Sequence, residues 1–132
     1  MKALTVCQPY AELIANGEKV IENRTWATIV RGPLAIHAGK SRAWLSDDDH
    51  QKANYGVDIG AIPFGAVVAV ARLRGCCRIQ DLPLDLRDHM HAEGPWCWIL
   101  EDVRRITPVP CSGAQGLWEW AGLTASPTER ET

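Results

Sequence analysis

The stretch GAVVAVARLRGCCRI, residues 65–79, has the strongest β-strand pattern in the chain and decides the fold. Its run of alanine and valine at 66–71 is typical of a strand that is buried on both faces. The run is also far shorter than the roughly 20 apolar residues that a membrane helix needs. Because a glycine within a strand marks a bend or a bulge, Gly75 predicts a bend in this central strand.

The segments on either side of the central strand predict further strands. GPLAIHA at 32–38 is mostly apolar. In GPWCWILEDVRRI at 94–106, tryptophan and leucine alternate with other residues at the period of a strand. ALTV at 3–6 and KVIENRTW at 19–26 are shorter segments of the same kind. We therefore predict a sheet of about five or six strands.

Helices are predicted to be few and short. One begins at Pro9, because proline suits the first turn, and ends at Gly17, because glycine terminates helices. SRAWLSDDDHQKANYG at 41–56 predicts a second helix, which is capped by Ser41 or begins again near Ser46. Many strands with few helices favour an α+β fold built on a small barrel over an alternating α/β sheet. We expect one domain over 1–122, followed by a polar, disordered tail at 123–132.

The charge of the chain limits the partners that it can bind. Its 14 Lys and Arg against 16 Asp and Glu give a formal charge of −2, so the surface as a whole does not attract nucleic acid. Residues 1–46, however, hold six basic and three acidic side chains, a net charge of +3. Any nucleic-acid site is therefore expected to be local and to lie in this part of the chain.

The cysteines and histidines do not form a recognisable metal or disulfide pattern. The five cysteines are odd in number and show no CxxC spacing, which argues against a disulfide framework and a zinc ribbon. His89 and His91 lack a second ligand pair nearby, which argues against a metal there. We therefore predict a cytoplasmic protein without a metal, a cofactor or a membrane segment.

Three charged side chains stand out in GEKVIENRTW, residues 17–26, because the segment otherwise has the pattern of a strand. In the first of two explanations, Lys19, Glu22 and Arg24 are structural and face solvent from an edge strand. In the second, their side chains meet at one place and form a functional cluster. A strict strand would place Glu22 and Arg24 on one face and Lys19 on the other, so convergence requires a bulge or a twist.

Other polar residues would add to such a cluster, namely His37, Lys40, Ser41 and Arg42 in HAGKSR. The set suits a ligand with a phosphate and a polar ring, in which Lys19 or Arg24 binds the anion. The carboxylate of Glu22 or Glu101 would accept a hydrogen bond from an exocyclic amine of the ring. Trp26, which we expect to be the exposed tryptophan, would stack on the face of the ring. Glu101 interrupts an apolar strand, so we expect Lys19 or Arg24 to pair with it.

A lysine beside a glutamate also suits hydrolysis. Partial burial lowers the pKa of a lysine toward the range that is useful for proton transfer at neutral pH. Lys19 and Glu22 are the candidate pair, and Arg24 would bind an anionic group beside them.

Several segments together resemble the ASCH family of small domains, namely LTVCQPYAELIANGEKVIENRTW at 4–26, GPLAIHAGK at 32–40, GPWCWILEDVRRI at 94–106 and GLWEW at 116–120. The most specific element is a GxKxxExR pattern, formed by Gly17, Lys19, Glu22 and Arg24 and preceded by Gln8 and Pro9. The resemblance implies a PUA-like fold, a small β-barrel of about five or six strands flanked by short helices. It also implies a cleft where the pattern meets the mouth of the barrel.

The resemblance further implies a role with RNA, either as a binding domain or as a hydrolase such as a ribonuclease. One branch of the family consists of amidohydrolases that act on N4-acetylcytidine through a lysine, a threonine and a glutamate. Lys19 matches the lysine, but Glu22 occupies the threonine position, so the nucleophile does not carry over. Thr25 and Ser41 are nearby hydroxyls and the candidates to replace this threonine, but the spacing assigns the role to neither. Cys7 stands where relatives often have a basic residue, which removes one phosphate contact.

Our hypothesis is a domain that binds a nucleotide or single-stranded nucleic acid, RNA in preference to DNA, around the GxKxxExR pattern. The predicted ligand-binding residues are Gln8, Trp26, His37, Lys40, Ser41, Arg42 and Glu101. A first alternative is a hydrolase of RNA or modified nucleosides, with Lys19, Glu22 and Arg24 as its catalytic residues. A second alternative is a protein-interaction domain in which the same charges are structural.

Overall fold

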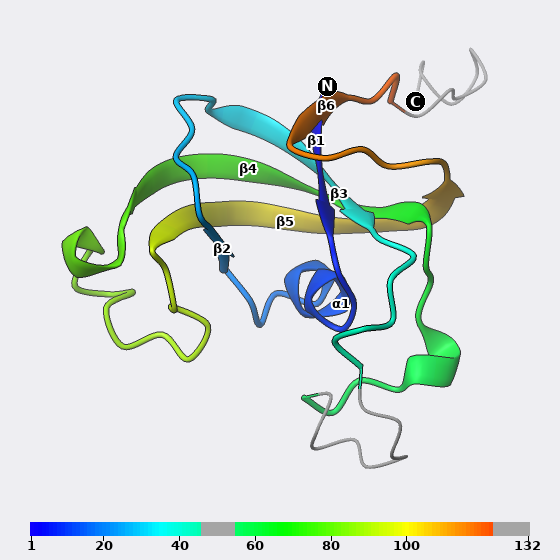
Figure 1. Cartoon of the computed structure of the whole chain (residues 1–132), viewed down its shortest axis with the longest axis horizontal. Coiled ribbons are helices and arrows are strands. Elements are labelled where there is room, and N and C mark those ends of the chain that lie inside the picture. Colours follow the sequence, from blue (N-terminus) through cyan, green and yellow to red (C-terminus); the bar gives the residue numbers. More distant parts are fainter. Residues whose placement is uncertain (46–54, 123–132) are drawn as a thin grey trace.

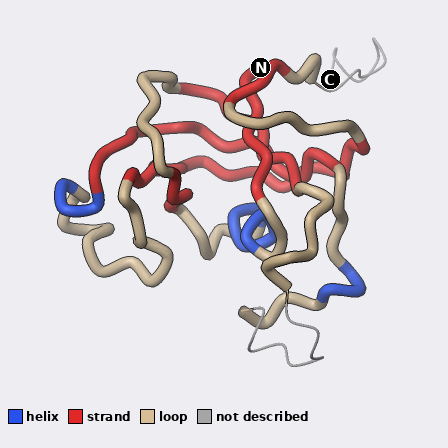
Figure 2. The backbone as a smooth tube through the Cα atoms, in the orientation of Figure 1, coloured by secondary structure: helices blue, strands red, loops and turns tan. Residues whose placement is uncertain are grey.

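The computed structural model describes residues 1–45 and 55–122. Its strands form one six-stranded sheet in the order β2-β5-β4-β3-β1-β6. The elements are β1 (Lys2–Val6), α1 (Tyr10–Ala15), β2 (Ile21–Arg24), β3 (Gly32–Ala38), the 3₁₀ turn η2 (Ile59–Ala61), β4 (Ala66–Arg78), the 3₁₀ turn η3 (Ile79–Asp81), β5 (Trp96–Pro110) and β6 (Leu117–Glu119). The sheet curls into a half-barrel, and α1 lies against one of its faces (Figure 1). Strands dominate and the helices are short, as predicted (Figure 2).

β4 and β5 are the longest strands and pair antiparallel in the sheet. The apolar residues at 66–69 of β4 are buried, as expected for a central strand. The register between the two strands shifts between Leu73 and Gly75, where the sequence predicts a bend, and β4 continues past this point to Arg78. β5 extends beyond its predicted end, as far as Pro110.

β2 lies at one edge of the sheet and pairs antiparallel with the first part of β5. Its regular register places Glu22 opposite Trp98 and Arg24 opposite Trp96. The strand is shorter than the predicted 19–26 at both ends, because it begins at Ile21 and ends at Arg24. Lys19 therefore precedes the strand, and the alternation of strand faces does not fix the direction of its side chain.

α1 begins directly after Pro9 and ends before Gly17, as predicted. Gly17 has a φ of +89°, a conformation that glycine adopts without steric strain. The helix packs against β3, β4 and β5 through buried residues that include Leu13 and Ile14. The Lys19 N–H donates to the Leu13 carbonyl at 3.0 Å, which holds the segment before β2 against the helix.

Two hydrophobic clusters support the charged strand. The larger one lies between α1 and the sheet and contains Leu4, Ile14, Leu34, Ile36, Trp98 and Leu100 among its buried residues. A smaller one contains Ile21, Leu82, Leu86, Cys97 and Ile99 and lies under β2 and the segment that leads to β5. Close packing in both clusters restricts the movement of β2.

The second helix does not begin at Ser41, so this part of the prediction is wrong. Residues 41–45 form a turn, in which Ser41 Oγ accepts from the Ala43 N–H at 3.2 Å and so competes with helical hydrogen bonding. Residues 46–54 of that prediction and the predicted tail at 123–132 lie outside the described residues. Among the residues that are described, no helix has the length and apolar character to span a bilayer.

Candidate functional site

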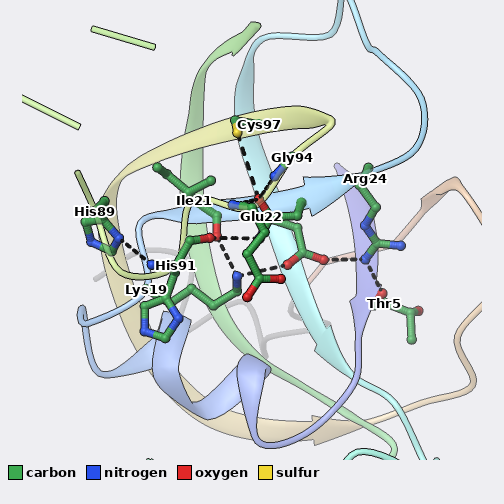
Figure 3. A network of polar contacts seen from close by, with 11 residues as sticks. Thr5, Lys19, Ile21, Glu22, Arg24, His89, His91, Gly94 and Cys97 are labelled. Atoms are coloured by element: carbon green, nitrogen blue, oxygen red, sulfur yellow. Dashed lines mark hydrogen bonds and ion pairs between the residues drawn. The ribbon is translucent and has the colours of Figure 1, made fainter. Parts of the chain in front are cut away.

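Lys19, Glu22 and Arg24 converge at the edge of the sheet (Figure 3). Glu22 Oε1 lies 3.5 Å from Lys19 Nζ, and Glu22 Oε2 lies 2.7 Å from Arg24 Nη2. β2 keeps a regular register with β5, so a bulge in this strand is not what brings the three together. Lys19 instead reaches Glu22 from the segment before the strand.

Lys19 is deeply buried for a cation, with 3% of its surface exposed. Its ammonium group donates to the Ile21 carbonyl at 2.6 Å and lies 5.6 Å from the centroid of the Tyr10 ring. Burial lowers the pKa of Lys19 from its ordinary value, while the Glu22 carboxylate partly opposes the shift. The site thus contains a lysine that gives up its proton more readily than a surface lysine does.

Arg24 connects the cluster to β1. Its Nη2 also donates to the Thr5 carbonyl at 2.8 Å. Its Nε is buried and has no hydrogen-bond partner in the described part of the chain. The guanidinium group therefore keeps one buried donor that the described residues do not use.

Asn23, between the two charged residues of β2, anchors the segment that precedes β5. Its Nδ2 donates to the His91 carbonyl at 2.8 Å. Its Oδ1 accepts from the backbone N–H of Glu93 at 2.9 Å and from that of Gly94 at 2.8 Å. A single side chain thus fixes three backbone groups of the segment that carries His91.

His91 is 4% exposed and lines the same cleft as Lys19. Burial lowers the pKa of His91, and the charges of Lys19 and His89 lower it further. The imidazole is therefore uncharged at neutral pH. The sequence analysis considered His91 only as a metal ligand and argued against that role, because no local pattern links the residue to Lys19.

The two histidines that were considered as metal ligands contact each other through a side chain and the backbone. His89 Nδ1 accepts from the His91 N–H at 3.1 Å, while the His91 ring lies at the cleft. Within 1–45 and 55–122, no three His, Cys, Asp or Glu side chains are grouped as they would be around a metal ion.

A cleft of about 310 Å³ opens beside the charged cluster. This volume is at the lower end of the range of about 300–1,000 Å³ that small-ligand sites occupy. Besides Lys19, Glu22 and Arg24, its lining includes Tyr10 and Trp44, which the sequence analysis did not place at the site. The cleft therefore combines buried charges with aromatic surface.

The exposed tryptophan at the cleft is Trp44, so the prediction that it would be Trp26 is wrong. Trp44 is 63% exposed. Trp26 packs edge-on against Trp98, with ring centroids 4.7 Å apart. Trp98 Nε1 also donates to the Trp26 carbonyl at 3.2 Å, and the two contacts hold Trp26 against the core.

Three other predicted ligand-binding residues lie away from the cleft. Gln8 is fully buried, and its side chain donates to one backbone carbonyl at 2.8 Å and accepts from one backbone N–H at 2.9 Å. Ser41 and Arg42 are exposed. The Arg42 guanidinium lies 4.6 Å from the centroid of the Phe64 ring.

Glu101 pairs with Arg72, so the prediction that Lys19 or Arg24 would pair with it is wrong. Its carboxylate lies 3.3 Å from Arg72 Nε. The register of β4 and β5 places these two residues directly opposite each other. The side chain of Glu101 is 39% exposed, so it did not need the buried partner that was expected.

His37 and Lys40 line a second cavity of about 400 Å³, beside the segment 112–115. His37 Nε2 lies 2.8 Å from the Cys111 carbonyl, which only accepts, so Nε2 donates and Nδ1 accepts from the Thr5 hydroxyl at 3.2 Å. Thr5 lines both cavities. The predicted ligand-binding residues are therefore divided between two places on the surface.

Gly113→Ala is expected to lower the free energy of unfolding by about 1–3 kcal/mol. A β-carbon at this position would lie 2.5 Å from Thr5 Oγ1 and 2.7 Å from the His37 ring, so it would force the two side chains apart. Urea denaturation measures the loss. Gly60→Ala is the control, because the nearest atom to its added β-carbon is 3.5 Å away. Equal losses in the two variants would contradict the prediction.

Comparisons with known proteins agree with this architecture. The model of the ASCH domain matches residues 4–110. The crystal structure of ASCH from Zymomonas mobilis aligns with a TM-score of 0.54 at 15% identity, over 98% of this chain and 90% of that one. A serine-to-alanine mutant of that protein aligns with a TM-score of 0.54 at 13% identity, over 92% and 88% of the two chains. No curated protein matches the sequence.

Identities this low show a common fold and nothing more. The structural alignments confirm the predicted α+β, PUA-like architecture, which appears here as a curled sheet of six strands with few short helices. The match to the family model extends over most of the chain, from Leu4 to the end of β5 at Pro110. The chain therefore belongs to the ASCH domain family.

Proposed function

We propose that the cleft binds a base of single-stranded RNA. The observation that carries the proposal is the cluster of Lys19, Glu22 and Arg24, which opens onto a cleft of small-ligand size. The carboxylate accepts hydrogen bonds from the exocyclic amine of a base, and the two cations donate to its carbonyl or ring-nitrogen acceptors. Proteins read bases in this way mainly in single-stranded RNA, where the bases are able to leave the stack.

Aromatic side chains beside the cluster support the binding of a planar ring. Trp44 lines the cleft and lies edge-on to Tyr10, with ring centroids 6.5 Å apart. Stacking of a base on an aromatic side chain contributes about 1–3 kcal/mol. This is comparable to one hydrogen bond to a charged group, so the aromatic and charged parts of the cleft would contribute similar amounts.

The family context favours RNA over DNA, because the ASCH family is generally linked to RNA binding. The formal charge of −2 indicates that the domain neutralises few phosphates. The logarithm of the affinity should then fall with a shallow slope against the logarithm of the salt concentration.

A hydrolase of RNA or of modified nucleosides is the second candidate, and the lowered pKa of Lys19 favours it. A lysine whose pKa is lowered by burial acts as a general base more readily than a surface lysine, and the Glu22 carboxylate lies 3.5 Å from its ammonium group. N4-acylated cytidines and short RNAs are the substrates to test.

Lys19→Met tests both candidates. Methionine keeps the apolar length of the side chain, and Glu22 keeps Arg24 as its partner, so the fold should persist. Fluorescence anisotropy with short single-stranded RNAs should show that the variant binds about tenfold more weakly than the wild type. Lys40→Met, in the second cavity, is the control and should bind as the wild type does.

Equal binding by the wild type and Lys19→Met would contradict the proposal, and a larger loss in Lys40→Met would assign binding to the second cavity. Mass spectrometry of the same RNAs and of N4-acetylcytidine separates binding from hydrolysis. A product that the wild type forms and Lys19→Met does not would establish the hydrolase. Its mass would distinguish deacylation from strand cleavage.

A further inference from the structure

The described residues contain two buried side-chain nitrogens without a hydrogen-bond partner, Arg24 Nε and His91 Nε2. Both residues line the cleft. Buried polar atoms in folded proteins nearly always have partners, so each exception needs an explanation. Because both exceptions occur at one cleft, a ligand that bonds to the wall of that cleft explains them together.

The formal charges that line the cleft balance. Lys19 and Arg24 supply two positive charges, and Glu22 and Glu93 supply two negative ones. His91 adds no charge at neutral pH, because burial and the nearby Lys19 keep its pKa low. A cleft without net charge attracts a phosphate group weakly, whereas it suits an uncharged ring that carries donors and acceptors.

We infer that the cleft takes the uncharged base of a nucleoside, that His91 Nε2 hydrogen-bonds the edge of this base, and that phosphate groups stay outside. The inference rests on the proposed function, specifies its ligand and adds His91 as a residue that determines specificity. Arg24 Nε donates to an acceptor of the same ligand.

The backbone of His91 positions the ring for this contact. Its carbonyl accepts from Asn23 Nδ2 at 2.8 Å, and its N–H donates to His89 Nδ1 at 3.1 Å. Its ring lies 5.4 Å from that of Tyr55, measured between centroids. None of these contacts uses Nε2, so the ring is held in place while this buried nitrogen has no partner among the described residues. A buried group of this kind rejects ligands that leave it unpaired, which is how a site discriminates between bases.

NMR of the wild-type protein with ¹⁵N-labelled histidine rings gives the direct test. Cytidine, uridine, adenosine and guanosine are added in turn, and the best-binding one is expected to shift the Nε2 resonance of His91. The resonances of His37, which is fully hydrogen-bonded at the second cavity, should not move. The same nucleoside and its 5′-monophosphate should bind with affinities within about threefold of each other, because the phosphate makes no contact in the cleft.

His91→Leu adds a second readout. It is expected to weaken binding of that nucleoside about tenfold and to leave the unfolding temperature unchanged or higher, because leucine removes an unpartnered buried nitrogen. A residue with a purely structural role would lower the unfolding temperature instead. Met90→Leu changes a neighbouring side chain that is 71% exposed, and this matched control should alter neither quantity.

A monophosphate that binds more than about tenfold more tightly than its nucleoside would overturn the inference. The inference would also be overturned by an Nε2 resonance of His91 that stays in place while a nucleoside binds. A protein that binds RNA through Lys19 but binds no nucleoside would overturn it as well. In each of these cases, RNA binding that depends on Lys19 leaves the proposed function standing, whereas a wild type that binds no RNA rejects the proposed function itself.

Discussion

Glu22→Gln is expected to lower the free energy of unfolding by about 3 kcal/mol, a large fraction of the stability of a small domain. Glu22 is the shared partner of Lys19 and Arg24, and the side chain of Lys19 is only 4% exposed. Removing one member of a buried ion pair leaves the other charge without compensation in a poorly solvated place. Urea denaturation at neutral pH measures the loss.

The pH dependence of this loss gives an independent check. Without the attraction of Glu22, the pKa of Lys19 should fall further below its ordinary value. The unfolded chain then binds more protons than the folded chain between the lowered pKa and the ordinary one, so stability rises with pH in that window. The variant should therefore approach the wild type as the pH rises through the window.

Glu101→Gln is the matched control, because it removes the same type of charge from a pair in which the side chains are 60% and 39% exposed. Pairs this exposed contribute about 0–1 kcal/mol. A loss in Glu22→Gln no larger than that in the control would show that the cluster is well solvated. A folded Glu22→Gln protein that binds RNA as the wild type does would support the reading in which the charges are structural.

Asn23→Ala is expected to lower the free energy of unfolding by about 2–4 kcal/mol and to abolish RNA binding. The asparagine side chain satisfies the His91 carbonyl and the N–H groups of Glu93 and Gly94, and alanine would leave all three without this partner. The segment before β5 would then move, and His91 would leave the wall of the cleft. Urea denaturation and anisotropy on the same protein preparation measure the two effects.

Two further variants define the cause of this loss. Asn16→Ala is the control, because Asn16 is exposed and its side chain accepts one hydrogen bond, from the Glu18 N–H at 2.9 Å. Asn23→Asp keeps an acceptor for the N–H groups of Glu93 and Gly94 but removes the donor to His91. The loss of stability in Asn23→Asp should be larger than that in Asn16→Ala and smaller than that in Asn23→Ala. A loss in Asn23→Ala equal to that of the control would show that water replaces the asparagine without difficulty.

Much of the fold follows from local sequence. The apolar run at 66–71 indicates the central strand, and Pro9 and Gly17 set the limits of α1. Local patterns failed at 41–45, where the Ser41 hydroxyl favours a turn over a helix. The strength of these predictions lies in hydrophobic pattern and backbone restriction, both of which act over a few residues.

Local sequence patterns predicted only part of the candidate site. Lys19, Glu22 and Arg24 are close in sequence and meet in space. Asn23 and His91 are far apart in sequence, and their contact depends on how the segment before β5 returns to β2. An asparagine within a charged strand was the available signal, because a buried amide requires several partners.

Strand register also decided which predicted partners were wrong. Glu101 pairs with Arg72 because β4 and β5 place the two residues opposite each other, and single-sequence patterns do not specify register between distant strands. The predicted exposed tryptophan failed for a related reason. Trp26 packs on Trp98, which belongs to the strand paired with β2.

The pairing of β1 with β6 has a consequence for the order of folding. Lys2 lies opposite Glu119 and Ala3 opposite Trp118, so β1 is paired on both sides only after β6, a strand far along the chain, has formed. Contacts between such distant residues slow folding, because a long loop has to close before they form. During synthesis on the ribosome, β1 would therefore present an unpaired edge to other nascent chains until β6 emerges.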